Sequence, residues 1–98
     1  MQIVDYIPVG HTKAVTREQL SDRTGLGDRD VRRAIHEARR DTVILNIGGG
    51  YYRPDLRDPV DREEVIRFQK QEESRIKSTG WALKSARKMV REIKSMET

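Results

Sequence analysis

The chain has 98 residues, of which 35% are hydrophobic and 5% aromatic, so it can build only one modest core. Its formal net charge of +4 favours polyanionic partners. The chain lacks cysteine, which excludes disulfides and thiolate metal sites. No stretch approaches the roughly 20 apolar residues of a membrane-spanning helix. We therefore expect a soluble, cytoplasmic protein.

The first expected element is a short helix over residues 3–7. Ile3, Val4 and Ile7 fall on one helical face, and Pro8 ends the helix because proline disfavours the helical conformation of the residue before it.

A second helix is expected over residues 16–24, with Thr16 as its N-cap and Leu20 as its core contact. Gly25 is well placed as the left-handed residue just past the C-terminus. After this turn we expect Leu26 to point back under Leu20.

A third helix is expected from Asp28 to about Arg40. Its apolar residues share one side and form the predicted core stripe: Val31, Ala34, Ile35 and Ala38. Basic residues lie nearly opposite, with Arg32 on the flank: Arg29, Arg33, His36 and Arg40. Because a guanidinium fork matches guanine edges and phosphates, this face predicts a DNA recognition helix, the alternative being a solvated charged face.

A β-hairpin is expected next. The apolar run 43–47 and the segment 51–53 are its predicted strands, and Gly48 to Gly50 form its turn. We expect Tyr52 in the core and Tyr51 at the surface. Four hairpin residues are predicted to lie next to the DNA backbone: Asn46, Gly49, Tyr51 and Arg53.

Four segments together resemble a known family: Thr16-Arg17-Glu18-Gln19-Leu20, Thr24-Gly25-Leu26, Arg29-Asp30-Val31-Arg32-Arg33-Ala34-Ile35 and Gly49-Gly50-Tyr51-Tyr52. They resemble the winged helix-turn-helix domain at the N-terminus of biotin repressors and many bacterial regulators. With the segment 71–78, the chain is also similar to small winged-helix proteins carried in prophages of Gram-positive bacteria.

The resemblance implies DNA binding with support from the wing, through Arg29, Arg32, Arg33 and His36. The chain departs from the pattern at Gly27, where such regulators often have a serine cap. No ligand-binding or catalytic domain follows, so biotin-ligase activity is not implied.

A long helical region is expected after residue 58. The stretch 61–64 has capping-box spacing. Farther on, apolar and small residues follow alternating steps of three and four, in a heptad pattern: Ile76, Thr79, Leu83, Ala86, Val90 and Ile93. Gly80 interrupts this stripe, so the region is either one helix or two. We predict homodimerisation through Ile76, Leu83, Ala86, Val90 and Ile93, the alternative being a helix that folds back on its own core.

The predicted fold is mainly α with a small β-hairpin wing (α+β): a winged helix-turn-helix over residues 1–57 and a helical dimerisation and basic region over 58–98. Predicted DNA contacts also include Arg17 and Asp28. We expect a transcriptional regulator of phage origin that binds double-stranded DNA. The alternative is a structural or adaptor protein of a phage replication or packaging complex.

Enzyme function is not expected. The two histidines, His11 and His36, are far apart in the chain, and the glutamate pairs have the character of solubilising charges rather than an acid–base couple. We therefore predict no cofactor, no metal, no small-molecule ligand and no membrane partner.

Overall fold

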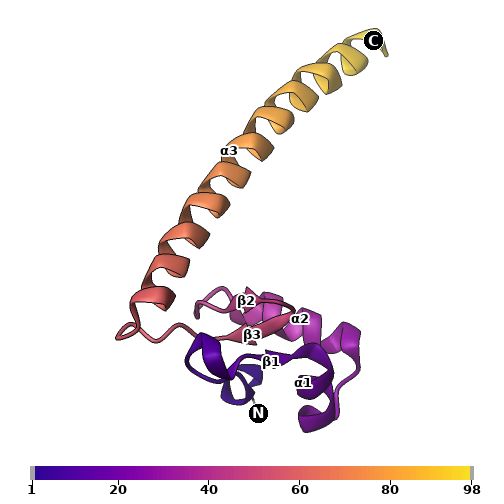
Figure 1. The fold of residues 1–98 in the computed structure, drawn as a ribbon. Helices are drawn as coiled ribbons and strands as arrows, with labels where there is room; N and C mark the ends of the chain where they lie inside the picture. Colours follow the sequence, from indigo (N-terminus) through magenta and orange to yellow (C-terminus); the bar gives the residue numbers. More distant parts are fainter. Residues whose placement is uncertain (1, 98) are drawn as a thin grey trace. The chain divides into compact units, whose positions relative to one another are not determined.

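The computed structural model describes residues 2–97 (Figure 1). Within that range the chain forms two 3-10 helices, three short strands and three α-helices: η1 (Ile3–Tyr6), η2 (His11–Lys13), β1 (Val15–Thr16), α1 (Arg17–Thr24), α2 (Asp28–Ala38), β2 (Leu45–Ile47), β3 (Gly50–Tyr52) and α3 (Pro59–Met96). The predicted class, mainly helical with a small antiparallel sheet, is confirmed.

The chain divides into two compact units, Met1–Ile66 and Arg67–Thr98, and α3 contributes to both. The first unit thus continues beyond residue 57, where the sequence placed its end, because the first turns of α3 pack with it and bury Asp61. None of the helices in the described range is long and apolar enough to cross a membrane.

The core of the first unit gathers side chains from η1, β1, α1, α2 and the segments that follow η1 and α2: Ile3, Ile7, Val15, Leu20, Val31, Ile35 and Ile44. The predicted stripe of α2 is confirmed, since Val31 and Ile35 are fully buried and Ala34 and Ala38 pack beside them. The expected burial of Leu26 is wrong, because its side chain is 38% exposed. Its backbone is held by two hydroxyls, with its amide donating to Thr24 Oγ1 and its carbonyl accepting from Ser21, and this leaves the side chain at the surface.

Both short α-helices begin and end as their sequences require. The Thr16 hydroxyl accepts a hydrogen bond from the Gln19 amide, and the Gln19 side chain accepts one from the Thr16 amide, which forms a capping box. Gly25 takes the left-handed conformation at φ 78° and ends α1. α2 ends at Ala38, and Arg40 lies in the turn that follows rather than on the helix.

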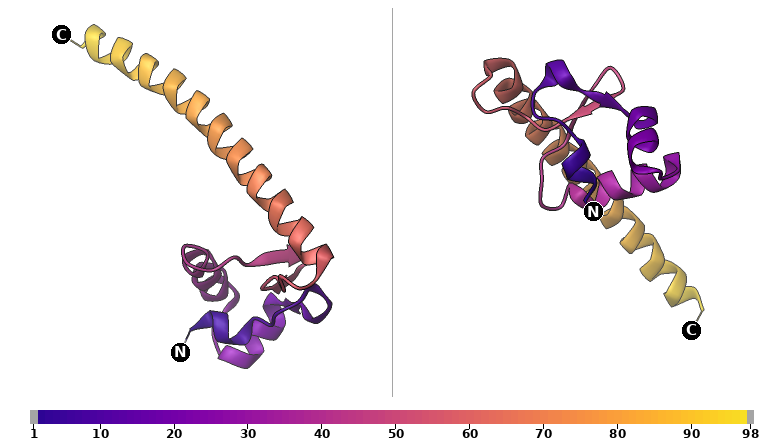
Figure 2. Two further views of the ribbon diagram at one scale, coloured as in Figure 1. Left: turned by 90° about the vertical axis from the view of Figure 1, so that its left-hand side faces the viewer. Right: turned by 90° about the horizontal axis from the view of Figure 1, so that it is seen from below.

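The sheet has the order β1-β3-β2, with antiparallel pairing throughout (Figure 1). Figure 2 shows the ribbon from two further directions. Strand β1 was not anticipated, and its Thr16 pairs with Gly50 of β3. The hairpin turn consists of Gly48 and Gly49 alone, both at positive φ, which is the geometry of a tight primed turn. Gly50 is instead a buried strand residue.

Successive side chains of a strand point to opposite faces, which predicts one buried and one exposed tyrosine in β3. The two tyrosines differ in burial less than this alternation predicts. Tyr52 is 1% exposed, which confirms its predicted place inside. Tyr51 is half-buried and packs against the core, so its expected surface position is wrong. The cause is the central position of β3, because Val15 of β1 and Asn46 of β2 flank Tyr51 on both sides.

Helix α3 begins earlier than its capping-box pattern suggested. Asp58 is the cap, since its Oδ1 accepts from the Val60 amide at 2.9 Å, and Pro59 occupies the first helical position, where its missing N–H has no consequence. Asp61 is buried inside the first turn instead of capping it. The helix continues without a break through Gly80, so the C-terminal region is one helix.

The close approach of Gly50 to its neighbours generates a stability prediction. A Cβ at this position would lie 2.9 Å from the Cβ of Ala14 and 3.3 Å from the Ile47 carbonyl oxygen. We expect Gly50→Ala to lower the free energy of unfolding by about 1–3 kcal/mol, because overpacking moves backbone as well as side chains. Urea unfolding followed by circular dichroism measures the change. Gly27→Ser is the control: nothing lies within 4 Å of its added Cβ and serine also caps helices, so a comparable loss there would refute the steric cause.

Candidate nucleic-acid interface

The exposed side of α2 carries the predicted recognition residues. Arg29, Arg33 and His36 are all exposed, and none of their side chains has a hydrogen-bond or ion-pair partner within residues 2–97. They lie opposite Val31 and Ile35 because those two side chains are the ones that the core buries. Because one side of α2 packs against the core, the N–H groups of the side chains on its other side are presented to solvent.

This face is not uniformly basic. Asp30 and Glu37 precede and follow Arg33 by one turn and border it on one flank, whereas Arg29 and His36 border it on the other. An approaching polyanion is attracted to the second flank and repelled by the first. The charge pattern thus favours one side of the helix as the contact edge.

Asp28 joins two further predicted contact residues. Its carboxylate forms ion pairs with Arg17, whose Nε lies 3.3 Å away, and with Arg32, whose Nε lies 3.2 Å away, so the start of α1 is linked to the start of α2. The three side chains are substantially exposed, and such ion pairs stabilise a fold only slightly. The main effect of Asp28 is therefore to orient the two arginines rather than to stabilise the fold. Each arginine still has N–H donors that do not face Asp28.

The hairpin tip lies beside this ion-pair group. Gly49 borders the same surface hollow as Arg17 and Asp28, and Glu18 and Asp22 also line it. Three carboxylates and one guanidinium give the hollow a negative balance, which is unsuited to a phosphate. The structure thus brings Arg17, Asp28 and Gly49 together at a surface that is less basic than the exposed side of α2.

The remaining predicted contacts lie apart from one another. Arg40 is exposed in the turn after α2, Asn46 is exposed on β2, and Tyr51 is half-buried at the edge of the core. Arg53 is tied to the N-terminal segment: its Nε donates to the Ile7 carbonyl at 2.8 Å. Its amide donates to the Pro8 carbonyl at 2.7 Å.

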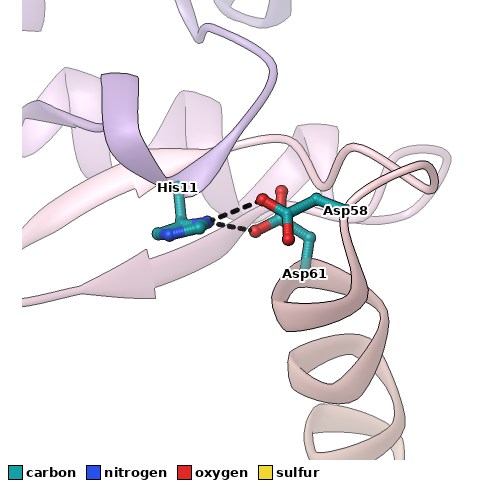
Figure 3. A group of neighbouring side chains, drawn as sticks. All are labelled: His11, Asp58 and Asp61. Carbon is teal, nitrogen blue, oxygen red and sulfur yellow. Dashed lines mark hydrogen bonds and ion pairs between the residues drawn. The ribbon is translucent and has the colours of Figure 1, made fainter.

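A cluster that sequence reasoning missed joins His11 with Asp58 and Asp61 (Figure 3). His11 Nδ1 lies 2.6 Å from Asp61 Oδ1 and 3.4 Å from Asp58 Oδ2. His11 comes from η2 and both aspartates from the start of α3, all within the first unit. The only sequence signal was the Asp58-Pro59 helix start, which by itself carries no information about a histidine from the other end of the chain.

Burial raises the pKa of the neighbouring Tyr52, and the negative charges of Asp61, Glu64 and Asp58 raise it further. The Tyr52 ring lies edge-on to His11, with 6.3 Å between the ring centres. This corner of the first unit is therefore electronegative, in contrast to the exposed side of α2. No family model, curated protein or solved structure matches the chain.

The contacts of Arg53 generate a second stability prediction. Ile7 is fully buried, so removal of the guanidinium leaves its carbonyl without this donor. We expect Arg53→Ala to reduce the free energy of unfolding by about 1–2 kcal/mol, measured by urea denaturation. Arg40→Ala is the matched control, because an exposed arginine that has no ion-pair partner within residues 2–97 should change stability by less than about 0.5 kcal/mol. Equal effects of the two substitutions would show that the bond to Ile7 contributes nothing.

Proposed function

We propose that this chain is a winged-helix protein that binds double-stranded DNA, with α2 as the recognition helix and the β2–β3 hairpin as the wing. The observation that carries the proposal is the exposed set of Arg29, Arg33 and His36 opposite the buried side of α2, whose side chains have no partner among residues 2–97. A helix that follows a sharp glycine-containing turn can enter a major groove, where arginine donates to guanine O6 and N7. A role in transcriptional control is the corresponding biological function.

Arg17, Asn46 and the hairpin tip would contact the sugar–phosphate backbone beside that groove. Gly49 has no side chain and takes positive φ, so the backbone at the tip can approach a phosphate closely. Arg40, in the turn after α2, can reach a phosphate at the other end of the helix. These contacts fix orientation, whereas the α2 side chains read base edges.

The second unit supports a homodimer. Along α3 the heptad residues Ile76, Leu83, Val90 and Ile93 are between 46% and 72% exposed. Gly80 and Ala86 leave a hollow on the helix surface beside Leu83 and Val90, into which side chains of a facing helix can pack. A second copy of the chain is the partner we propose, because its identical stripe is complementary in both length and spacing.

The residues beside the stripe favour a parallel pair. With Ile76, Leu83 and Val90 at position a of the heptad, Arg87 and Lys94 occupy position e. Position g holds Arg75 before Ile76 and is apolar from there on, with Ala82, Met89 and Met96. In a parallel pair, position g of one chain meets position e of the other. The aliphatic stems of Arg87 and Lys94 then lie over the apolar side chains at position g. In an antiparallel pair, position e meets position e of the partner, so the basic Arg87 and Lys94 would lack these apolar neighbours and would repel each other in any register that pairs them.

Selection of bound sequences from a random double-stranded DNA pool tests the proposed function. We expect enrichment of a two-fold symmetric site whose halves lie about one helical turn, roughly 34 Å, apart or a multiple of that distance. Binding that depends on DNA length without sequence enrichment would instead support a structural role in a nucleoprotein complex. Absence of DNA binding at low salt would reject both.

The third prediction concerns Arg33 at the centre of the exposed side of α2. Arg33→Ala should weaken binding to the selected site by about 1–3 kcal/mol and relax base preference at one position, because a base-edge contact is lost. Fluorescence anisotropy with the selected site and single-base variants measures both effects.

Glu37→Gln is the companion substitution, since it removes a negative charge on the opposing flank and should strengthen binding to all sequences alike. If Arg33→Ala leaves both affinity and base preference unchanged, α2 is not the recognition helix.

The fourth prediction concerns the stripe on α3. The parent protein should form a parallel homodimer, with a mass near twice 11.4 kDa in light scattering. Leu83→Glu combined with Val90→Glu should give monomers, because each glutamate places an unpaired charge between the two α3 helices. The monomers should lose most of the affinity for the selected DNA site. The first unit should keep its fold.

Ser78→Glu combined with Ser85→Glu adds the same charge outside the stripe and should remain dimeric. Because the chain has no cysteine, Thr79→Cys reports on orientation: position d meets its own copy in a parallel pair, and oxidation should then cross-link the two chains. A parent protein that remains monomeric at tens of micromolar contradicts the dimer.

A further inference from the structure

The cluster of His11, Asp58 and Asp61 presents one nitrogen and two carboxylate oxygens to a common point (Figure 3). The ligand atoms of the three side chains all lie within 4.8 Å of one another. Asp61 is fully buried, while His11 and Asp58 keep 24% and 32% of their side chains exposed. The cluster can thus be reached from solvent on one side and is closed on the other.

Each aspartate uses one oxygen to hold its own position and directs the other at His11. Asp58 Oδ1 accepts from the Val60 amide at 2.9 Å, which leaves Oδ2 toward the imidazole. Asp61 Oδ2 accepts from the Asp55 amide at 2.8 Å, which leaves Oδ1 toward the imidazole. Carboxylates that bind metals are characteristically held by such hydrogen bonds to their second oxygen.

The charge of the cluster favours a cation. Two carboxylates face a single imidazole, so the formal charge of the group is negative. The effect of Asp58 and Asp61 on the pKa of Tyr52 has the same origin. A dication between the three side chains would offset that charge and would take the place of the contact between His11 Nδ1 and Asp61 Oδ1.

We propose that His11, Asp58 and Asp61 bind a divalent transition-metal ion of the Zn²⁺ class. An imidazole nitrogen with two carboxylate oxygens is a donor set that suits Zn²⁺ better than Mg²⁺ or Ca²⁺. Two ligand atoms that each lie about 2.0 Å from a tetrahedral ion are roughly 3.3 Å apart. The 3.4 Å between His11 Nδ1 and Asp58 Oδ2 already fits this spacing. The 2.6 Å between His11 Nδ1 and Asp61 Oδ1 would have to increase by less than about 1 Å. The fourth position would hold water.

The metal would join η2 to the first turn of α3 inside the first unit and would stabilise the folded chain. Because Asp61 is buried and the three ligands come from two different elements, the ion would hold those elements together. The inference rests on this cluster alone and is independent of DNA binding.

The test is titration of the full metal-free chain with ZnCl₂, followed by calorimetry and by thermal unfolding. One Zn²⁺ should bind per chain and raise Tm with concentration, whereas MgCl₂ at the same concentration should not. His11→Gln and Asp58→Asn should each weaken Zn²⁺ binding by at least about tenfold. Asn retains the oxygen that caps α3, so Asp58→Asn separates loss of a ligand from loss of the cap.

His36→Gln is the matched control, since His36 is the other histidine of the chain and lies exposed on α2. Unchanged Zn²⁺ affinity in this variant supports the proposal. A parent chain that does not bind Zn²⁺ would overturn it. So would equal losses in His36→Gln and His11→Gln, or full affinity retained in Asp58→Asn. If His11→Gln fails to fold, the comparison of Asp58→Asn with His36→Gln decides the question.

Discussion

The arrangement of the first unit depends on the position of Thr16, which takes part in two structures at once. Its backbone pairs with Gly50 in the central strand, and its side chain caps α1. The hairpin is thereby held against the start of α1, and the turn at Gly25 then directs α2 across the same core. Because Gly50 meets Ala14 without a Cβ between them, the sheet can pack this closely. Neither the hairpin nor α2 could move independently without breaking these contacts.

Local patterns in the sequence were sufficient to predict the features that depend on neighbouring residues. The caps at Thr16 and Gly25, the buried and exposed sides of α2, and the glycine turn of the hairpin all follow from spacing over a few positions. The contacts between distant residues could not be predicted. Arg53 bonds to Ile7 across 46 positions and His11 to Asp61 across 50, and no periodicity encodes such pairs.

The start of α3 shows how a correct rule can be applied at the wrong residue. Asp61 and Glu64 have the spacing of a capping box, yet Asp58 followed by Pro59 is the stronger start signal, because proline fits the first helical position. The aspartate left inside the first turn is then buried and requires partners. His11 and the Asp55 amide supply them, so a single shift of the helix start accounts for the whole electronegative cluster.

The ion pairs of Asp28 divide the arginines of the proposed DNA surface into two kinds. Arg29 and Arg33 form no ion pair within residues 2–97, whereas Arg17 and Arg32 share a carboxylate that would accompany them into any complex. An arginine that brings its own counter-charge neutralises less of the phosphate backbone and so releases fewer condensed counterions. The slope of affinity against salt concentration would then reflect fewer basic residues than contact the DNA. The number of phosphate contacts inferred from that slope would therefore be a lower bound.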